Sequence, residues 1–259
     1  MSSKEINEIK NLLAKQNVIY NENDLYTTGK NPKIFSKPKT KKPDERIPSP
    51  WATMTVDNYC GYQAKPGNIT IKLVKKGDRG DDEGVMTLNN IWRQLEDFNN
   101  DILEIPELYR ESISQGYAYE IWWTTTEADV QGLVIAPEWK IVSGAAGYPV
   151  WSNDLKPKLE AFYYFTEEYD TNTEKIIETV TIYKPFLNEI WSKPEDLDTW
   201  VQVELVETPY SQVSVASFFP NRKKTPIFEA GKLLINSYDE LISKSMNEVL
   251  RFNDLFLML

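Results

Sequence analysis

The side chains of this chain that could do acid–base or nucleophilic chemistry are almost all carboxylates. The 259 residues include 39 Asp and Glu, one cysteine and no histidine. Without histidine there is no Ser-His-Asp or Cys-His nucleophile arrangement, no HExxH metal site and no side chain that titrates near neutrality without tuning. Most hydrolase mechanisms therefore lose their base, and only paired carboxylates remain to act as acid and base.

Two carboxylate pairs, Asp81-Asp82 and Glu167-Glu168, stand side by side in the sequence. Such pairs arise by chance among 39 acidic residues, and both occur in polar, turn-like contexts, so we interpret them as solvated loop charges. The segment Gly77–Gly84 lacks the alternating ligands and closing glutamate of a calcium loop, and we predict a surface turn there. No GxxxxGK[ST] or GxGxxG motif is present. We therefore predict no catalytic residue, no metal site and no cofactor.

The composition is that of a globular protein, with 41% hydrophobic and 26% charged residues. Cys60 is the single cysteine, so an internal disulfide is excluded and a reducing compartment is compatible. No apolar run approaches the roughly 18 residues of a membrane span, and we expect no membrane partner. The net charge of −10 disfavours general adhesion to nucleic acid, although weakly adhesive walls would suit a conduit along which DNA slides.

The first 50 residues divide into a helix and a basic arm. The spacing of Ile6, Ile9, Leu12 and Leu13 predicts an amphipathic helix over residues 3–16. The stretch that follows is rich in Lys, Pro, Asn and Thr and cannot build a core. We expect an extended arm that contacts nucleic acid or an acidic neighbouring subunit, or else a solvated linker. The candidate contact residues are Lys37, Lys39, Lys41, Lys42 and Arg46.

Periodicity then predicts helices followed by strands. Helices are expected over Pro50–Tyr62, ending at Gly61, from Thr87 to Phe98 and over Asp101–Gly116. Alternating and aromatic-rich segments predict strands, separated by short polar turns. These segments are Ile69–Lys75, Tyr117–Thr124, Gly132–Ala136, Trp139–Val142, Leu159–Tyr169, Lys175–Tyr183, Phe186–Ser192, Trp200–Val206 and Gln212–Phe219. The class is therefore α+β, an antiparallel β meander flanked by helices and ending in a long C-terminal helix.

The last segment, Gly231–Leu259, contains no proline and no further glycine and becomes more apolar toward its end. Its apolar residues recur at helical spacing, on one stripe of a helix. Because a helix usually ends with a polar or basic turn, we expect a longer protein whose missing part covers this end, or alternatively an end that docks in a groove or on a partner. The candidate inter-domain or subunit contacts are Val249, Phe252, Phe256 and Leu259.

Three segments in this order resemble the phage portal (connector) proteins of the siphophage type. Arg46–Tyr62 is similar to the stretch in which a basic residue and an isoleucine precede a helix ending in a tyrosine-glycine element. Ile91–Glu120 is similar to an asparagine-bearing helix, a second helix and a G-x-A-Y-E strand. Val213–Glu248 is similar to a strand followed by a helix with a polar motif, although Asn236 stands where aspartate is usual and Asp239 where asparagine is usual.

The resemblance implies a structural protein, not an enzyme, and only its N-terminal, wing part. It implies an N-terminal helix and basic arm (1–49), a wing-like α+β domain (50–230) and a long helix (231–259) leading to a stem, clip and crown. It also implies a ring, commonly of twelve copies, at the capsid vertex of the virion, assembled in the host cytoplasm. Its implied partners are the terminase, capsid and head-completion proteins and the double-stranded DNA that passes through the channel during packaging and ejection.

Two other functions stay open at this point. A histidine-free carboxylate glycan hydrolase would place two carboxylates about 5 to 10 Å apart across an aromatic cleft. A non-viral binding or adaptor domain would expose a contiguous apolar patch on its sheet. Neither alternative accounts for the three ordered segments.

Overall fold

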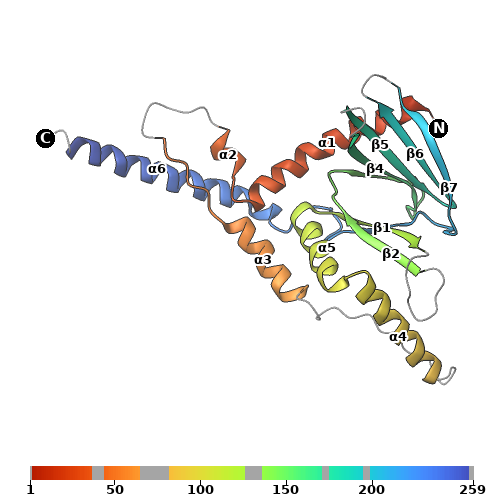
Figure 1. Cartoon of the computed structure of the whole chain (residues 1–259). Coiled ribbons are helices and arrows are strands. Elements are labelled where there is room, and N and C mark those ends of the chain that lie inside the picture. Colours follow the sequence, from red (N-terminus) through yellow and green to blue (C-terminus); the bar gives the residue numbers. More distant parts are fainter. Residues whose placement is uncertain are drawn as a thin grey trace.

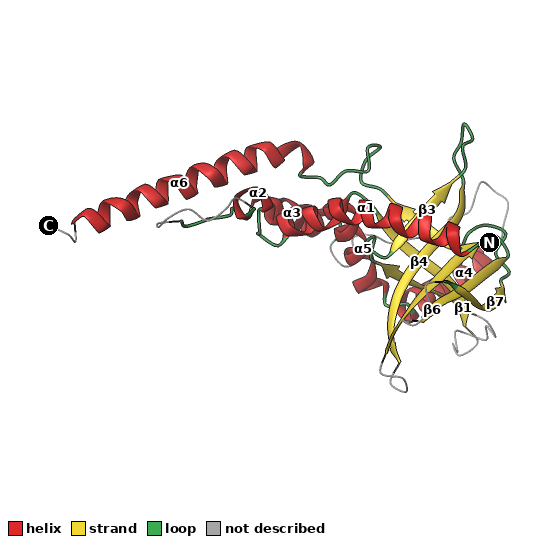
Figure 2. Cartoon of the chain, turned by 90° about the horizontal axis from the view of Figure 1, so that it is seen from above, coloured by secondary structure: helices red, strands yellow, loops and turns green. Residues whose placement is uncertain are grey.

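Two antiparallel sheets lie at one end of the molecule, and a long helix projects from the other (Figures 1 and 2). The computed structural model describes residues 2–36, 44–64, 82–125, 136–170, 175–194 and 199–256. The α+β class is confirmed. Its helices are α1 (Ser3–Thr27), α2 (Pro32–Phe35), α3 (Trp51–Gln63), α4 (Asp82–Phe98), α5 (Asp101–Gln115), the 3₁₀ turn η1 (Glu229–Gly231) and α6 (Lys232–Phe256).

The larger sheet is the predicted antiparallel meander, with the strand order β3-β4-β5-β6-β7. Side chains of a strand alternate between its faces, so Phe162 and Tyr163 point to opposite sides of the sheet. Tyr163 packs with Ile6 of α1, whereas Phe162 packs with Tyr119 of the second sheet. The meander is therefore covered on both faces. Its strands are β3 (Gly147–Trp151), β4 (Leu159–Asp170), β5 (Lys175–Lys184), β6 (Leu187–Pro194) and β7 (Val201–Glu207).

The smaller sheet has the strand order β2-β1-β8. The sequence patterns predicted one meander and did not indicate that these strands form a second sheet. Its strands are β1 (Ala118–Thr125), β2 (Ala136–Val142) and β8 (Val215–Phe218). The two predicted strands Gly132–Ala136 and Trp139–Val142 were wrong as separate elements, because β2 runs unbroken from Ala136; residues 132–135 lie outside the described residues. Strand β3 was missed, since it contains Gly147 and Pro149, two residue types that are depleted in strands. Proline is tolerated there because β3 is an edge strand.

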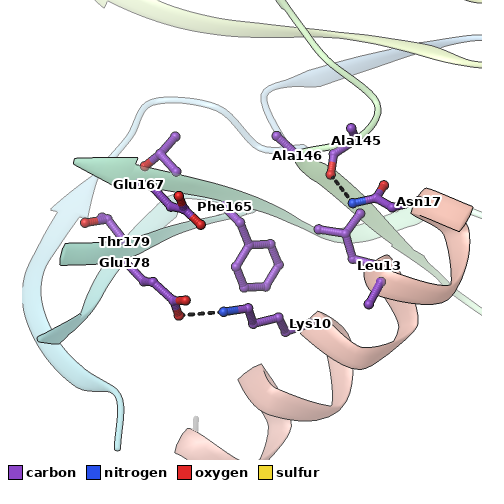
Figure 3. A pocket seen from close by; sticks show the side chains of 11 residues that line it. Lys10, Leu13, Asn17, Ala145, Ala146, Phe165, Glu167, Glu178 and Thr179 are labelled. Carbon is purple, nitrogen blue, oxygen red and sulfur yellow. Dashed lines mark hydrogen bonds and ion pairs between the residues drawn. The ribbon is translucent and has the colours of Figure 1, made fainter. Parts of the chain in front are cut away.

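Helix α1 is much longer than the predicted 3–16 and fixes the N-terminal segment to the meander. It begins with a capping box between Ser2 and Glu5. Lys10 forms an ion pair with Glu178 of β5 at 2.5 Å, and the Asn17 amide donates to the carbonyl of Ala145 at 2.8 Å (Figure 3). These contacts border a cavity of about 430 Å³ between α1 and the sheet. The polar second half of α1 gave no clear period, yet Asn23 and Tyr26 are buried there.

Several predicted helix boundaries were wrong. Gly61 does not end α3, which continues to Gln63. Helix α4 begins at Asp82 and not at the predicted Thr87, which lies inside it. The last residues of the predicted turn Gly77–Gly84, from Asp82 on, are therefore helical. The predicted strand Ile69–Lys75 lies outside the described residues. Glu167-Glu168, interpreted as loop charges, lie within β4. Among the described residues, no helix has the length and apolar character to cross a membrane.

Gly116, which ends α5, is expected to tolerate no side chain. It has φ +92, and a Cβ there would lie 2.4 Å from the Lys224 carbonyl oxygen. Left-handed strain and the clash together predict that Gly116→Ala lowers the free energy of unfolding by about 2 to 4 kcal/mol. Urea unfolding measures this change. The control is Gly61→Ala in α3, where nothing lies within 4 Å and a gain of up to about 1 kcal/mol is expected. A loss below about 1 kcal/mol for Gly116→Ala would contradict this geometry.

Glu120 on β1 is expected to make folding pH-dependent. Burial raises the pKa of its carboxyl, a hydrogen bond from Trp122 lowers it, and Asp101 and Glu104 of α5 raise it, so that the resulting pKa is about 7. The folded chain thus holds a proton that the unfolded chain releases above pH of about 4.5, so stability falls as the pH rises from about 4.5 to 7. Glu120→Gln should remove this fall and be about 1 to 2 kcal/mol more stable than the wild type at pH 8. Denaturant titrations from pH 5 to 8 test this, and parallel curves would refute it.

Candidate assembly surface on helix α6

Helix α6 is amphipathic in an unusual sense, because its polar side is the buried one. Four polar residues lie three, four and four positions apart and therefore on one side of the helix: Asn236, Asp239, Ser243 and Asn247. Asp239 is fully buried. All four belong to the helix whose motif carried the family resemblance. This polar row faces residues 26–31 and 45–49 of the N-terminal part of the chain instead of solvent.

The side chains of the polar row bind backbone groups of an extended segment. The amide of Ser49 donates to Asp239 at 2.8 Å, and the amide of Ile47 donates to the Ser243 hydroxyl at 3.0 Å. Asn247 continues the series by accepting from the Glu45 amide at 2.7 Å and donating to the Glu45 carbonyl at 3.1 Å. Two extended residues advance about 6.6 Å and one helical turn of four about 6 Å, so the two periods match. Residues 45–49 consequently run antiparallel along α6.

The start of α6 is bonded to α1 and α2. The Asn31 amide donates to the second oxygen of Asp239 at 2.6 Å, and the Tyr26 hydroxyl donates to Asn236 at 2.7 Å. Lys232 reaches Asn23 at 2.8 Å and lies over the ring of Tyr26. Because these donors and acceptors are buried or partly buried, breaking a pair would leave an unsatisfied polar group. The direction in which α6 leaves the body is therefore fixed.

The opposite side of α6 is apolar and exposed. The side chains of Leu241 and Phe252 are 61% and 60% exposed. At 100° per residue the centre of this apolar row lies about half a turn away from the centre of the polar row. We call this row the α6 stripe: Leu234, Tyr238, Leu241, Val249 and Phe252. An apolar row of this length on a projecting helix is typical of a surface that another polypeptide covers.

The α6 stripe continues into a small cavity next to α3. Trp51 packs edge-on against Tyr238, with ring centroids 6.3 Å apart. A cavity of about 210 Å³ lies between the residue 47–54 segment and Ile242. Trp51 and Met54 are each about half exposed. The stripe and this cavity together offer an apolar row and a recess, the combination that accepts a side chain from a partner.

The structure places only part of the predicted contact residues. Val249 and Phe252 are exposed and belong to the α6 stripe. Phe256 is the last residue of α6, and Leu259 lies outside the described residues, as do Lys37, Lys39, Lys41 and Lys42. The Arg46 guanidinium bonds the Asp44 carboxylate at 2.9 Å and the Phe35 carbonyl at 2.9 Å, so it closes the base of the basic arm. The contact roles proposed for these residues stay predictions.

The match with known proteins decides the family. A model of the family described as phage portal protein, SPP1 Gp6-like, matches residues 2–259. The chain belongs to this portal family. No curated protein matches it at a significant level. The matched range includes all three resembling segments, so the family resemblance is confirmed. Portal proteins are structural components of the phage particle, and the family match favours this role over the glycan-hydrolase and adaptor alternatives.

The buried carboxylates of this portal chain serve the fold. Asp239 accepts from Asn31 and Ser49, as described above, and Asp101 accepts from the Trp139 indole at 2.6 Å. Glu189 accepts from Trp191 and Lys184. Hydrogen bonds from Lys184 and Trp191 lower the pKa of Glu189 against the opposing effect of burial. Within the described ranges, no cluster of three or more metal-ligating side chains is found.

Proposed function

We propose that this portal chain assembles into a closed ring at the capsid vertex and that the α6 stripe packs against the neighbouring copy. The observation that supports this most directly is the opposed faces of α6: its polar row is bonded within the chain, whereas its apolar row is open. In a ring each copy must present two different surfaces, and the head-to-tail contact closes by rotation. The stripe with its recess beside Trp51 supplies one such surface.

The ring would act as a passive conduit for duplex DNA. The net charge of −10 keeps most of the surface from adhering to phosphates, which favours sliding over binding. A separate ATP-consuming motor, the terminase, would drive packaging, and capsid and head-completion proteins would bind other faces. The division into residues 1–49, 50–230 and 231–259 is part of this proposal, with α1 packing on the meander and α6 leading toward the stem.

The assembly is tested on the complete gene product. Light scattering after size exclusion, combined with electron microscopy, should show closed rings of about twelve copies. Since hydrophobic contacts drive the stripe association, rings should persist at moderately raised salt. A strictly monomeric protein at every salt and protein concentration would contradict the proposed function.

A further inference from the structure

Two surface loops outside the α6 stripe form one joined structure. The first loop is residues 152–158, between β3 and β4, and the second is residues 221–225, between β8 and α6. At their bases the rings of Trp151 and Phe219 lie 6.3 Å apart, and the Lys224 ammonium lies 5.1 and 4.2 Å from their centroids. Both loops project on the same side of the molecule (Figure 2). They therefore present a single surface, which we call the loop pair.

The loop pair is basic in an otherwise acidic chain. Its exposed cations outnumber its one carboxylate, Asp154, by four, whereas the whole chain carries −10. In the part of the chain that the structure describes, none of these cations is within ion-pair distance of a carboxylate. The cations are Lys156, Lys158, Arg222, Lys223 and Lys224. A concentration of unpaired positive charge attracts an anion from outside the chain.

Both loops are held in shape by their own bonds. The Lys158 amide donates to the Ser152 hydroxyl at 3.0 Å and the Ser152 amide donates to the Lys158 carbonyl at 2.8 Å. Asn221 donates to the Thr225 carbonyl at 2.7 Å. Lys224 has φ +53, a left-handed conformation that costs a residue with a side chain about 1 kcal/mol or more. This backbone brings the ammonium over the two aromatic rings instead of letting it follow the loop outward.

The chemistry of this surface favours a polyanion over a protein partner. The cores of protein interfaces are enriched in aromatic residues and depleted in lysine. Here lysine dominates, and the aromatic side chains at the base are covered by Lys224. Exposed cationic groups on loops held by internal hydrogen bonds instead suit phosphates, which are bound as charges without sequence readout. We infer that the loop pair contacts the phosphate backbone of duplex DNA, an inference that takes its ligand, but not its geometry, from the proposed function.

The inference is tested by comparing two variants with equal charge. The loop variant combines K156Q, K158Q, R222Q and K223Q, and it leaves Lys224 in place to preserve the packing at the base. The control variant removes four exposed lysines elsewhere, with K4Q, K15Q, K140Q and K244Q. Binding to a labelled 30-base-pair duplex of random sequence is measured by fluorescence anisotropy from 50 to 200 mM salt. Light scattering of each protein gives its assembly state independently.

The loop variant should bind the duplex at least 10-fold more weakly at 50 mM salt, and the affinity of the control variant should stay within about threefold of wild type. In the loop variant the slope of log affinity against log salt concentration should also fall by the equivalent of about two or more phosphate contacts. Equal losses in both variants would reduce the effect to net charge and overturn the inference. Unchanged DNA binding in the loop variant would also overturn the inference. If that variant bound DNA normally but no longer assembled, the loops would be assigned to a contact between subunits. Neither result affects ring formation by the wild type, so the inference and the proposed function fail separately.

Discussion

Replacing Asp239 with alanine is expected to lower the free energy of unfolding by about 2 to 4 kcal/mol, a large change for one polar side chain. Both of its oxygens are used, one by the Asn31 amide at 2.6 Å and the other by the Ser49 backbone amide at 2.8 Å. The residue is fully buried. Removing the carboxylate leaves two donors without a partner and opens a cavity. Water does not easily reach the two donors to replace the lost bonds.

In this variant, the segment around residues 44–49 should unfold locally before the whole chain unfolds. Because Asp239 holds residue 49 and α2 against α6, we expect proteolysis within residues 44–49 to accelerate in Asp239→Ala before the sheets unfold. Chemical denaturation gives the global value, and limited proteolysis with mass spectrometry gives the site. Ser237→Ala is the control, since this exposed hydroxyl bonds only the carbonyl one turn earlier in the same helix. An Asp239→Ala variant within about 0.5 kcal/mol of wild type would show that the polar row does not fix α6.

Placing glutamate on the α6 stripe is expected to abolish the ring. In Leu241→Glu/Val249→Glu, two charges would have to enter an apolar contact, where an unpaired carboxylate is strongly disfavoured. Both side chains are exposed in the single chain, at 61% and 54%, so its folding should change by less than about 1 kcal/mol. Light scattering should therefore report monomers or small oligomers of a folded protein.

A matched variant separates this effect from that of net charge. Lys244→Gln/Arg251→Gln also lowers the net charge by two on the same helix, and these residues form only surface ion pairs with Glu240 and Glu248. Such pairs contribute little to stability. The matched variant should form rings of wild-type mass. If both variants assemble equally well, the ring contact lies elsewhere on the molecule.

The parts that could be predicted from the sequence are those with a strong local period. Strands β4, β5 and β6 lie within two residues of their predicted bounds, because aromatic and β-branched residues are concentrated there between short polar turns. Helix α5 was also found, since Gly116 marks its end. The split into two sheets could not be predicted, because β8 pairs with β1 across about 100 residues of chain and no local pattern encodes that choice.

One of the two faces of the candidate site, the apolar one, could be predicted from the sequence. The α6 stripe was recognised from its spacing, and Val249 and Phe252 are exposed as a contact surface requires. The polar row was noticed only as a family motif, without a structural role. Besides Tyr26 and Asn31, its partners are the backbone amides of Glu45, Ile47 and Ser49, which have no sequence signature because every residue except proline carries one. The regular spacing of Asp239, Ser243 and Asn247 was the available signal, and it indicates a polar surface without saying what it binds.

The most direct test of the account is a photo-crosslink from the α6 stripe. A photoreactive phenylalanine analogue replaces Phe252 in the complete gene product, and the assembled protein is irradiated and analysed by mass spectrometry. We predict covalent dimers and higher multimers whose crosslinks join α6 of one copy to a neighbouring copy, and few such products when the analogue replaces Asn247 on the polar row. Crosslinks confined to a single chain, or to a different protein alone, would contradict the claim that the stripe is a contact between portal subunits.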